Sequence, residues 1–389
     1  MIKNKNIIMI LDNAFNPDLR VQKEINSLIK LGFSVDLICW DLEGELPESE
    51  KYENFNIYRV KIIAEKQQGI KKIFDLIKFF RKCIKKINSL KVNYDFFYAH
   101  DFLMLPIGVY LKMLKKKPLI YDAHEIYHIM EWEKYPRFLN SFMFFVEKQL
   151  LKFTDELIVV NKKRKEFYSK YYKGKDIKII GNWYDPYNGE SVSLRKMYSI
   201  PNDGVLLSYF GVINFYGRPI DKIIEKLIVH ENLYFFIAGV GKDEKLMSEM
   251  ASKNKHIYYL GWQKNIRKFM SDIDFMIYYQ NDKRKYFEYS APNTLYLAIS
   301  HKIPLISNVP GEVEELIQKF KIGYFIKDLK DLESKIEFDI NSKSYTEKLE
   351  GISNVKDQFN WSENEKKYSQ IFEALSYKST LKRKNLINT

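Results

Sequence analysis

The stretch that decides the fold is IIMILDNAFNPDLRVQKEINSLIKLGFSVDLICW, residues 7–40. It begins with a short apolar run and ends with a second one at 34–40, and such runs are typical of buried strands. Between them, apolar residues recur at helical spacing over 21–29, and Gly32 ends the helix. The stretch therefore predicts a strand, a loop, a helix and a second strand, which form one unit of a parallel α/β sheet.

The same alternation continues through both halves of the chain, with a turn-rich stretch at 181–189 between them. We expect two doubly wound, Rossmann-like α/β domains, 1–183 and 184–360, and then a terminal helix that crosses back to the first domain and a basic tail at 361–389. Parallel sheets of this kind bind ligands at the carboxyl ends of their strands, so we expect the two domains to face a cleft that holds the site. The expected strands lie at 7–11, 34–40, 57–63, 96–99, 119–122, 156–160, 206–210, 233–238, 257–260, 275–279, 305–307 and 323–326.

The composition excludes several classes of protein. Of the 389 residues, 46% are hydrophobic, which suffices for one or two cores and excludes a disordered chain. The two cysteines, Cys39 and Cys83, lack metal-binding spacing and fit a reducing cytosolic setting, and no apolar run is long enough to span a bilayer. The net charge of +13 favours an anionic partner, which could be a nucleic acid, a phospholipid surface or a phosphorylated substrate.

Polar residues follow several expected strands of the first half. The loop 12–20 lacks the glycine fingerprint of nicotinamide and flavin sites, and its polar residues fit a helix cap as well as a binding role. The loops 98–101 and 121–125 place His100 and His124 beside carboxylates, a combination that suits proton transfer or the binding of a hydroxyl group. These carboxylates could equally cap helices and the histidines could be packing residues. Neither loop has metal-ligand spacing.

In the second half, Gly211 follows an expected strand and Arg218 begins the next helix, which suits a diphosphate. A solvated arginine after a glycine turn fits equally well. The helix start at 290–294 could bind a phosphate or be an ordinary cap with proline in the first turn. The GxG at 239–241 more often marks a tight turn, and the DxD at 272–274 stands just before a strand, so we interpret its second aspartate as introducing that strand.

The segment 70–90 predicts an amphipathic helix with a basic face. Apolar residues recur along it at helical spacing, and its other faces carry seven lysine or arginine residues against one acid, Asp75. This profile is typical of a helix on an anionic membrane surface. It also fits a crossover helix that packs its apolar stripe on the sheet and leaves a basic back in solvent.

In their order and spacing, short motifs along nearly the whole chain resemble those of the GT-B glycosyltransferases. The similar group is the large retaining, nucleotide-sugar-dependent one (glycosyltransferase family 4-like). The most characteristic motif is Tyr121-Asp122-Ala123-His124-Glu125. The full set is 17–24 leading to 32–35, 94–101, 121–125, 179–182, 211–218, 236–241, 259–262, 290–296 and 361–363.

The resemblance implies that the first domain binds the acceptor and the second binds a nucleotide-sugar donor, with no cofactor and no metal. It assigns catalytic roles to His124 and Arg218. It assigns donor binding to Gly211, Asn214, Arg218, Gly239, Gly241, Glu288, Asn293 and Thr294. It assigns acceptor binding to Asn16, Arg20, Asp101, His124 and Glu125.

The sequence departs from the family pattern in the second half. Leu297 stands where the family has a ribose-binding glutamate, and Tyr289 stands where its E-x7-E partner would fall. Leucine cannot accept hydrogen bonds from ribose hydroxyls, so Glu288, one residue from the expected position, is the candidate replacement. Lys302 and Val212 are further departures, at a helix-ending glycine and at a second basic residue.

We therefore expect a cytoplasmic hexosyltransferase that transfers a sugar from a nucleotide-sugar donor to an envelope or capsule glycan precursor, lipid-linked and with retention. The basic helix at 70–90 would attach it to the anionic inner face of the cell membrane. Two alternatives remain open: a non-catalytic GT-B subunit that stabilises a partner transferase, and another reaction on a nucleotide sugar, such as epimerisation. No nucleic-acid partner is expected, since the sequence has no recognisable binding module.

Overall fold

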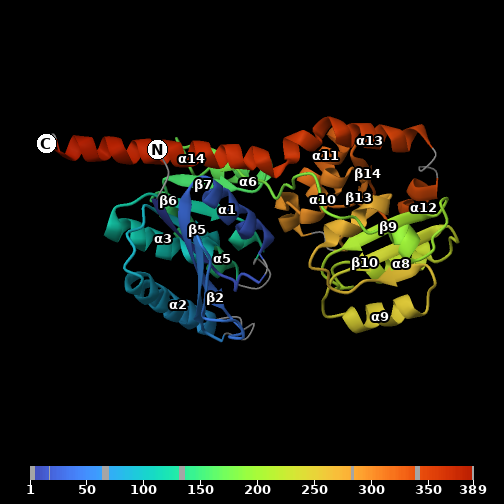
Figure 1. Ribbon diagram of the computed structural model, residues 1–389, viewed down its shortest axis with the longest axis horizontal. Coiled ribbons are helices and arrows are strands. Elements are labelled where there is room, and N and C mark those ends of the chain that lie inside the picture. The colour runs from blue at the N-terminus through green and yellow to red at the C-terminus, as the bar shows by residue number, and fades with distance from the viewer. Residues whose placement is uncertain are drawn as a thin grey trace. The chain divides into compact units, whose positions relative to one another are not determined.

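The computed structural model describes residues 5–16, 18–63, 70–130, 136–281, 284–337 and 342–387. The chain divides into two compact units, each a sheet with helices on its faces (Figure 1). Unit 1 contains residues 1–180 and 364–389, and unit 2 contains residues 181–363. The domain boundaries expected from the sequence, at residues 183 and 360, lie close to this division.

Unit 1 is built on an eight-stranded sheet with the order β3-β4-β2-β1-β5-β6-β7-β8. Neighbouring strands are parallel except for β3 and β4, which pair antiparallel at the edge. The six strands predicted for this half are present, and β3 and β8 are additional short ones. The strands are β1 (Lys5–Leu11), β2 (Phe33–Asp41), β3 (Ser49–Lys51), β4 (Phe55–Lys61), β5 (Phe96–His100), β6 (Leu119–Ala123), β7 (Glu156–Val159) and β8 (Ile177–Ile179).

The first helix of unit 1 forms as the decisive stretch predicts. The Asp18 carboxylate caps α1 by accepting a hydrogen bond from the Val21 amide at 3.1 Å, and the apolar face that includes Ile25 and Leu28 is fully buried. The helices of this unit are α1 (Leu19–Lys30), α2 (Ile70–Ser89), α3 (Asp101–Lys115), α4 (Tyr127–Met130), α5 (Arg137–Leu151), α6 (Lys162–Ser169) and α14 (Trp361–Ile387), which enters the unit at Asn364.

The last helix belongs to the core of unit 1. The ring of Phe372 in α14 lies 4.7 Å from that of Phe33 in β2 and 5.1 Å from that of Phe96 in β5. Tyr368, one turn earlier, is fully buried and places its hydroxyl 3.3 Å from that of Tyr98 in β5. The C-terminal helix therefore contributes side chains to the interior along β5, from its first residue, Phe96, to Tyr98.

Unit 2 is built on a six-stranded parallel sheet with the order β11-β10-β9-β12-β13-β14, and all six predicted strands are present. The strands are β9 (Val205–Phe210), β10 (Leu233–Ala238), β11 (Ile257–Tyr259), β12 (Phe275–Tyr278), β13 (Leu305–Ser307) and β14 (Gly323–Phe325). The helices are α7 (Leu194–Met197), α8 (Ile220–Leu227), α9 (Glu244–Ser252), α10 (Asn293–His301), α11 (Glu312–Phe320), α12 (Lys330–Glu337) and α13 (Lys343–Val355), with 3-10 helices η1 (Ile266–Asp272), η2 (Lys285–Tyr289) and η3 (Lys356–Phe359). Both units thus confirm the predicted doubly wound α/β class.

The strand order locates the sites within each unit. In unit 1, β1 lies between β2 and β5, so the chain reverses its direction of winding at β1. In unit 2, β9 lies between β10 and β12 and marks the corresponding reversal. Ligands of open α/β sheets bind at the carboxyl ends of the strands at such switch points. None of the helices in the described ranges is long and apolar enough to cross a membrane.

Candidate functional site

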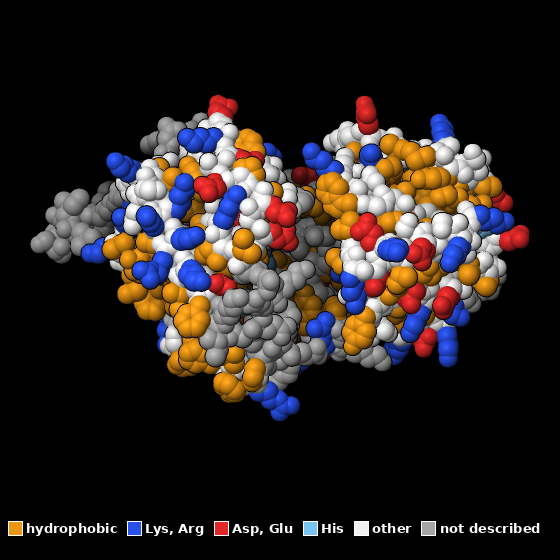
Figure 2. Space-filling model, turned by 90° about the horizontal axis from the view of Figure 1, so that it is seen from below, with side chains coloured by type: hydrophobic (Ala, Val, Ile, Leu, Met, Phe, Trp, Pro, Cys, Tyr) orange, Lys and Arg blue, Asp and Glu red, His pale blue; other side chains and the backbone are white. Residues whose placement is uncertain are grey.

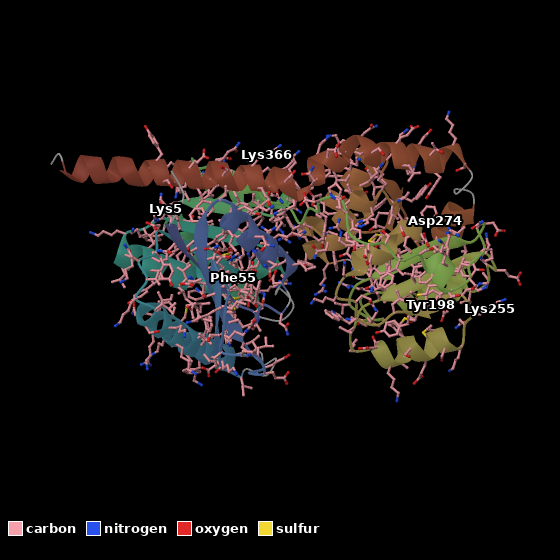
Figure 3. The ribbon with its side chains drawn as sticks, in the orientation of Figure 1. Lys5, Phe55, Tyr198, Lys255, Asp274 and Lys366 are labelled. Atoms are coloured by element: carbon pink, nitrogen blue, oxygen red, sulfur yellow. The ribbon has the colours of Figure 1, made fainter. Side chains whose placement is uncertain are left out.

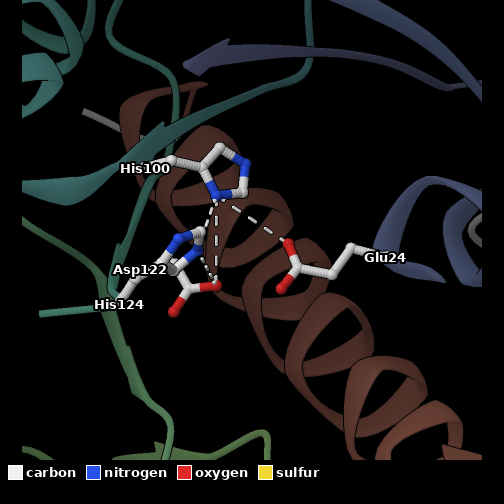
Figure 4. Close-up of side chains that lie close together, drawn as sticks. All are labelled: Glu24, His100, Asp122 and His124. Atoms are coloured by element: carbon white, nitrogen blue, oxygen red, sulfur yellow. Dashed lines mark hydrogen bonds and ion pairs between the residues drawn. The ribbon is translucent and has the colours of Figure 1, made fainter. Parts of the chain in front are cut away.

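The carboxyl edge of the unit 1 sheet gathers four ionisable side chains (Figure 4). Glu24 comes from α1, His100 ends β5, Asp122 lies in β6, and His124 follows that strand. Their nitrogen and oxygen atoms lie within 4.8 Å of one another. The cluster therefore occupies the switch point beside β1, where parallel sheets place their ligands.

Arg20 holds this cluster together from the first turn of α1. Its guanidinium donates two hydrogen bonds to the Asp122 carboxylate, at 3.0 and 2.8 Å, and a third to the Ile180 carbonyl at 2.8 Å. Its Nε also lies 3.0 Å from the Glu24 carboxylate. Burial raises the pKa of Glu24 to about 8, and the nearby Asp122 charge adds to this shift while Arg20 opposes it. Since the Arg20 guanidinium binds these partners and is mostly buried, it shapes the site by positioning Asp122.

His124 lies between two carboxylates. Its Nε2 is 3.2 Å from Asp122 and its Nδ1 is 3.4 Å from Asp101. The Nδ1 atom of His100 approaches the same Nε2 at 3.1 Å. His100 is fully buried, whereas the side chain of His124 is 16% exposed, so His124 is the histidine of this pair that can contact a ligand.

The protonation states of the two histidines differ. Burial, and second the charge of His124, lower the pKa of His100 to about 3. Burial also disfavours the charged form of His124, but Asp101 and Asp122 outweigh it and raise the pKa of His124 to about 10. Burial opposes the charge of Asp122, yet Arg20 and His124 hold its pKa well below the usual range. At neutral pH the site therefore combines an imidazolium, a neutral imidazole and a carboxylate.

The Glu24, His100, Asp122 and His124 side chains include the ligand types that zinc prefers. However, the Asp122 carboxylate and the Glu24 carboxyl group already face Arg20, and His124 carries a proton on the nitrogen that a metal would need. Ion pairing among the chain's own residues thus balances the charge of the cluster. A divalent ion would have to displace Arg20 from these carboxylates.

The remaining acceptor candidates lie around this cluster. Asp101 has a left-handed backbone with φ of 60°, and its carboxylate accepts a hydrogen bond from the Glu125 amide at 3.1 Å. Burial raises the pKa of Asp101 to about 7, against the attraction of His124. The Glu125 carboxylate pairs with Arg164 at 2.7 Å, and Asn16 is exposed in the loop after β1. Pro17, part of the first quoted motif, lies outside the described residues.

In unit 2, Arg218 lies across the loop that follows β9. Its Nη1 donates to the Tyr209 hydroxyl at 3.1 Å and lies 3.4 Å from the Val212 carbonyl. A Cβ atom added at Gly211 would lie 2.9 Å from that nitrogen, so the guanidinium lies close against the glycine. The Arg218 amide donates to the Asn214 carbonyl at 2.8 Å, which closes the loop just before α8.

The GxG after β10 has a packing reason of its own. A Cβ at Gly239 would lie 1.8 Å from the Gly211 carbonyl oxygen, and a Cβ at Gly241 would lie 2.1 Å from the Ile213 carbonyl oxygen. Gly239 also has a φ of 146°, which other residues rarely adopt. The two glycines therefore allow the loops after β9 and β10 to touch, whatever ligand binds there.

The helix α10 begins beside the neighbouring strand β12. Within the described residues, no side chain caps its start at Pro292, which leaves the first turn suited to an anion. Asn293 is exposed there, while Thr294 is buried. Glu288 is exposed in η2, and Leu297 is only 5% exposed within the hydrophobic core of unit 2. The position of the expected ribose ligand thus serves packing in this chain.

The DxD sequence is structural. The Asp272 carboxylate accepts hydrogen bonds from the Ser193 hydroxyl at 2.6 Å and the Arg195 amide at 2.9 Å. Asp274, labelled in Figure 3, pairs with the Arg195 guanidinium at 3.0 Å and accepts from the Leu206 amide at 2.8 Å. Asp274 therefore introduces β12 and ties it to β9, as the sequence predicts.

Sequence reasoning missed Glu24, Tyr98 and Tyr368 as members of the unit 1 site. Glu24 had a usable signal, since it stands four residues after Arg20 and four before Leu28, on the face of α1 that is buried. Tyr98 stands in the loop 98–101, which the sequence analysis singled out for His100, whereas Tyr368 had no signal, because it reaches the cluster only through the return of α14. Burial and the neighbouring charges raise the pKa of both tyrosines well above its usual value, so they remain neutral hydrogen-bonding groups.

The fold is that of the GT-B glycosyltransferases. The family model of Glycosyltransferase Family 4 matches residues 20–187, and the model of the Glucosyltransferase 3-like, C-terminal domain matches residues 221–368. Together the matches cover most of the chain, and the protein belongs to the GT-B glycosyltransferases, which confirms the resemblance drawn from its motifs. The second model covers the half in which Leu297 and Tyr289 depart from the family 4 pattern.

Solved structures share this fold over nearly their full lengths. Sucrose-phosphate synthase from Thermosynechococcus elongatus superposes with a TM-score of 0.71 at 16% identity, covering 96% of this chain and 99% of that one. Anabaena HepE in complex with UDP-glucose has a TM-score of 0.65 at 14% identity, covering 95% and 99%. The α,α-trehalose 6-phosphate synthase of Burkholderia multivorans has a TM-score of 0.64 at 9% identity, covering 97% and 98%. No curated protein sequence matches the chain.

Proposed function

We propose that the protein transfers a hexose, with retention and without a metal, from a uridine diphosphate sugar to a lipid-linked glycan precursor of the cell envelope or capsule. The observation that carries the proposal is the position of Arg218, which lies over the glycine loop after β9. A guanidinium at that loop matches a diphosphate in charge and geometry. Uridine is the first base to test because HepE, of similar fold, is solved with UDP-glucose.

Charge on the leaving diphosphate would be stabilised by two features of unit 2. Arg218 supplies fixed positive charge after β9, and the start of α10 supplies the positive end of a helix dipole after the neighbouring strand β12. Preorganised groups of this kind stabilise charge that develops in the transition state. They are the features that would allow the reaction to proceed without a metal.

The cluster of unit 1 would orient the acceptor or the transferring sugar. His124 is protonated and both its nitrogens face carboxylates, so it acts as a fixed cation and hydrogen-bond donor, and it is a poor proton acceptor. Asp101 is partly exposed, and its pKa of about 7 suits a group that binds a sugar hydroxyl. Arg20 acts through Asp122, and Glu125 and Asn16 complete the acceptor side.

A thermal-shift assay of the purified chain against UDP, GDP, dTDP, CMP and their sugars tests the proposal. A ligand at about 100 times its Kd adds roughly 2.7 kcal/mol of stability, which such an assay detects. UDP should raise the melting temperature of the wild type but not of Arg218→Ala, while Lys222→Ala in the exposed part of α8 is the matched control. An equal shift for Arg218→Ala and the control would refute the role of Arg218.

One observation favours a second candidate, a non-catalytic GT-B subunit that stabilises a partner transferase. Leu297 replaces the expected ribose ligand with a core residue. A folded protein with no shift across the nucleotide panel would support this candidate. A free epimer as the product, with no transferred sugar, would instead indicate epimerisation.

The proposed setting is the cytoplasmic face of the cell membrane, and α2 provides the first contact. Its exposed side includes Lys78, Arg81, Lys82 and Lys85, while Asp75 is buried. The side chains of Lys71 and Lys72, part of the predicted basic face, lie outside the described residues. A basic surface of this kind is attracted to anionic lipid headgroups.

A further inference from the structure

Three neighbouring helices of unit 1 expose large apolar side chains. Helix α3 contacts both α2 and α5, and the rings of Phe80 in α2 and Tyr110 in α3 lie 5.5 Å apart. We call these exposed side chains the apolar face. They are Ile73, Phe74 and Ile77 in α2, Tyr110, Met113 and Leu114 in α3, and Phe138, Phe142 and Phe145 in α5.

The clearest part of the apolar face is on α5. Phe138, Phe142 and Phe145 are 75%, 59% and 56% exposed, and their spacing places them on one side of the helix. Folded monomers rarely leave large apolar patches in water unless the patch binds a partner or a membrane. The opposite side of α5 already packs on the unit, because Asn140, Glu147 and Leu151 are buried.

The exposed charged side chains that the structure describes on these three helices, apart from Asp101 at the candidate site, are basic. The acids on the three helices are Asp75, Asp101 and Glu147, of which Asp75 and Glu147 are buried and Asp101 belongs to the candidate site. Figure 2, which views the face of unit 1 on which α2 lies, shows hydrophobic and basic side chains next to each other. The exposed basic residues of the helices are Lys78, Arg81, Lys82, Lys85, Lys115 and Arg137.

We propose that the apolar face binds an anionic lipid bilayer, with its aromatic and aliphatic side chains among the headgroups and its lysine and arginine side chains on the lipid phosphates. Stable attachment takes two signals, an apolar one and an electrostatic one, and this face supplies both. A protein partner fits the face less well, because lysine is depleted at protein interfaces. The inference deepens the membrane contact of the proposed function, but it does not depend on sugar transfer.

The apolar face lies on the side of unit 1 where a lipid-linked acceptor would need it. Helices that connect parallel strands begin near the carboxyl edge of the sheet, so the first turns of α2 and α5 lie toward the edge that holds His124. Ile73 and Phe138 belong to these turns. An acceptor whose lipid stays in the bilayer could then present its sugar to that edge.

Vesicle sedimentation of the full chain tests the proposal. The wild type should bind phosphatidylcholine vesicles that contain 30 mol% phosphatidylglycerol. Replacing Phe138, Phe142 and Phe145 by Ser should weaken binding by about tenfold or more, because each inserted ring contributes to partitioning. Replacing three residues that are also exposed but lie elsewhere, Val229, Leu246 and Tyr377, by Ser is the matched control and should leave binding unchanged.

Charge reversal separates the electrostatic signal. Replacing Arg81, Lys82 and Lys85 by Glu should also weaken binding by about tenfold, since each basic residue near an anionic surface contributes to attachment. Replacing Lys222, Lys245 and Lys253 of unit 2 by Glu gives the same net change of charge and should weaken vesicle binding less. Equal binding by the two charge variants would overturn the assignment of the surface.

A fluorescent label reports insertion directly. Cys39 and Cys83 are buried, so an environment-sensitive dye can be attached selectively to Phe142→Cys. Its emission should rise and shift to the blue with anionic vesicles, whereas a dye on Val229→Cys should not respond. No response at residue 142, or a protein dimer that the phenylalanine variants convert to monomer, would overturn the lipid assignment. UDP binding should be measured for the same variants. A loss of vesicle binding with unchanged UDP binding concerns the membrane contact alone, and a loss of UDP binding concerns the proposed transferase.

Discussion

The Nη2 atom of Arg20 donates to both oxygens of the Asp122 carboxylate, at 3.0 and 2.8 Å, and both side chains are almost completely buried. The pair joins α1 to β6, two elements that are about 100 residues apart in the sequence. Asp122 in turn accepts from Tyr98 at 3.3 Å and lies 3.2 Å from the imidazolium of His124. The position of His124 therefore depends on a residue that does not contact it.

Replacing Arg20 by Ala should destabilise the protein and reduce its activity. The change leaves the Asp122 carboxylate buried without its guanidinium partner, and breaking a buried ion pair in this way costs about 3–5 kcal/mol. Urea unfolding at pH 7 measures the loss. Arg20→Lys keeps the charge but not the paired geometry, and it should recover only part of the stability. A change below about 1 kcal/mol for Arg20→Ala would show that water replaces the pair without penalty.

The stability of the protein should fall as the pH rises from neutral toward 10, in part because of His124. The pKa of His124 is raised to about 10, so its contribution is complete below the ordinary histidine pKa near 6.5 and is lost as the pH rises through about 10. Within that window the contribution falls by about 1.4 kcal/mol per pH unit. The measurement is the free energy of unfolding of the wild type and of His124→Gln at pH 7, 8, 9 and 10.

In that comparison the difference between the two proteins is what matters, because groups that do not interact with His124 titrate equally in both. The wild type should lose more stability than His124→Gln over the pH series. His301→Gln is the control, because burial lowers the pKa of His301 to about 4 and this histidine stays neutral above pH 7. Parallel pH curves for the wild type and His124→Gln would mean that His124 is not protonated in the folded protein.

Gly239→Ala should destabilise unit 2 by about 3 kcal/mol or more, because it combines an unfavourable φ of 146° with a Cβ placed 1.8 Å from the Gly211 carbonyl oxygen. Gly261→Ala is a matched control, since Gly261 also has a positive φ, of 61°, but nothing lies within 4 Å of its added Cβ. Thermal unfolding of both variants separates the close contact from backbone strain. If Gly239→Ala and Gly261→Ala lose similar amounts of stability, the close contact does not explain the glycine at position 239.

Much of the fold follows from periodicity, because each strand–helix unit is a local pattern. The unit from β1 to β2 is predicted from one stretch, with the apolar face of α1 read directly from its spacing. Edge strand β3 escaped prediction because its residues, Ser49–Lys51, are polar, and only its pairing with β4 makes it a strand. The sequence pattern alone does not reveal such an edge strand, because its hydrogen bonds are formed with another segment of the chain.

The candidate site was predicted less completely for a related reason. His124 and Asp122 belong to a motif that can be recognised in the sequence. The burial of Glu24 and the low pKa of His100 depend instead on α1, β5, β6 and α14 packing around one point. Such tertiary effects have no local signal. Leu297 is the opposite case, because the sequence marks a missing ligand there and the structure shows that the position is filled by core packing.

Glu288→Ala should weaken binding of the nucleoside part of the donor if Glu288 replaces the ligand that is missing at Leu297. Glu288 is exposed in η2, and Gly311 packs against its backbone carbonyl, so its side chain can be removed with little effect on stability. Loss of a charged hydrogen bond to ribose costs about 1.5–3 kcal/mol, or roughly tenfold or more in Kd. Calorimetric titration with UDP and UMP should show this loss, and titration with pyrophosphate should show none.

Glu225→Ala, at an exposed glutamate of α8, is the control. If Glu288→Ala binds UDP as tightly as Glu225→Ala does, the ribose is held by another group, and the packing of Leu297 has removed this contact without a replacement.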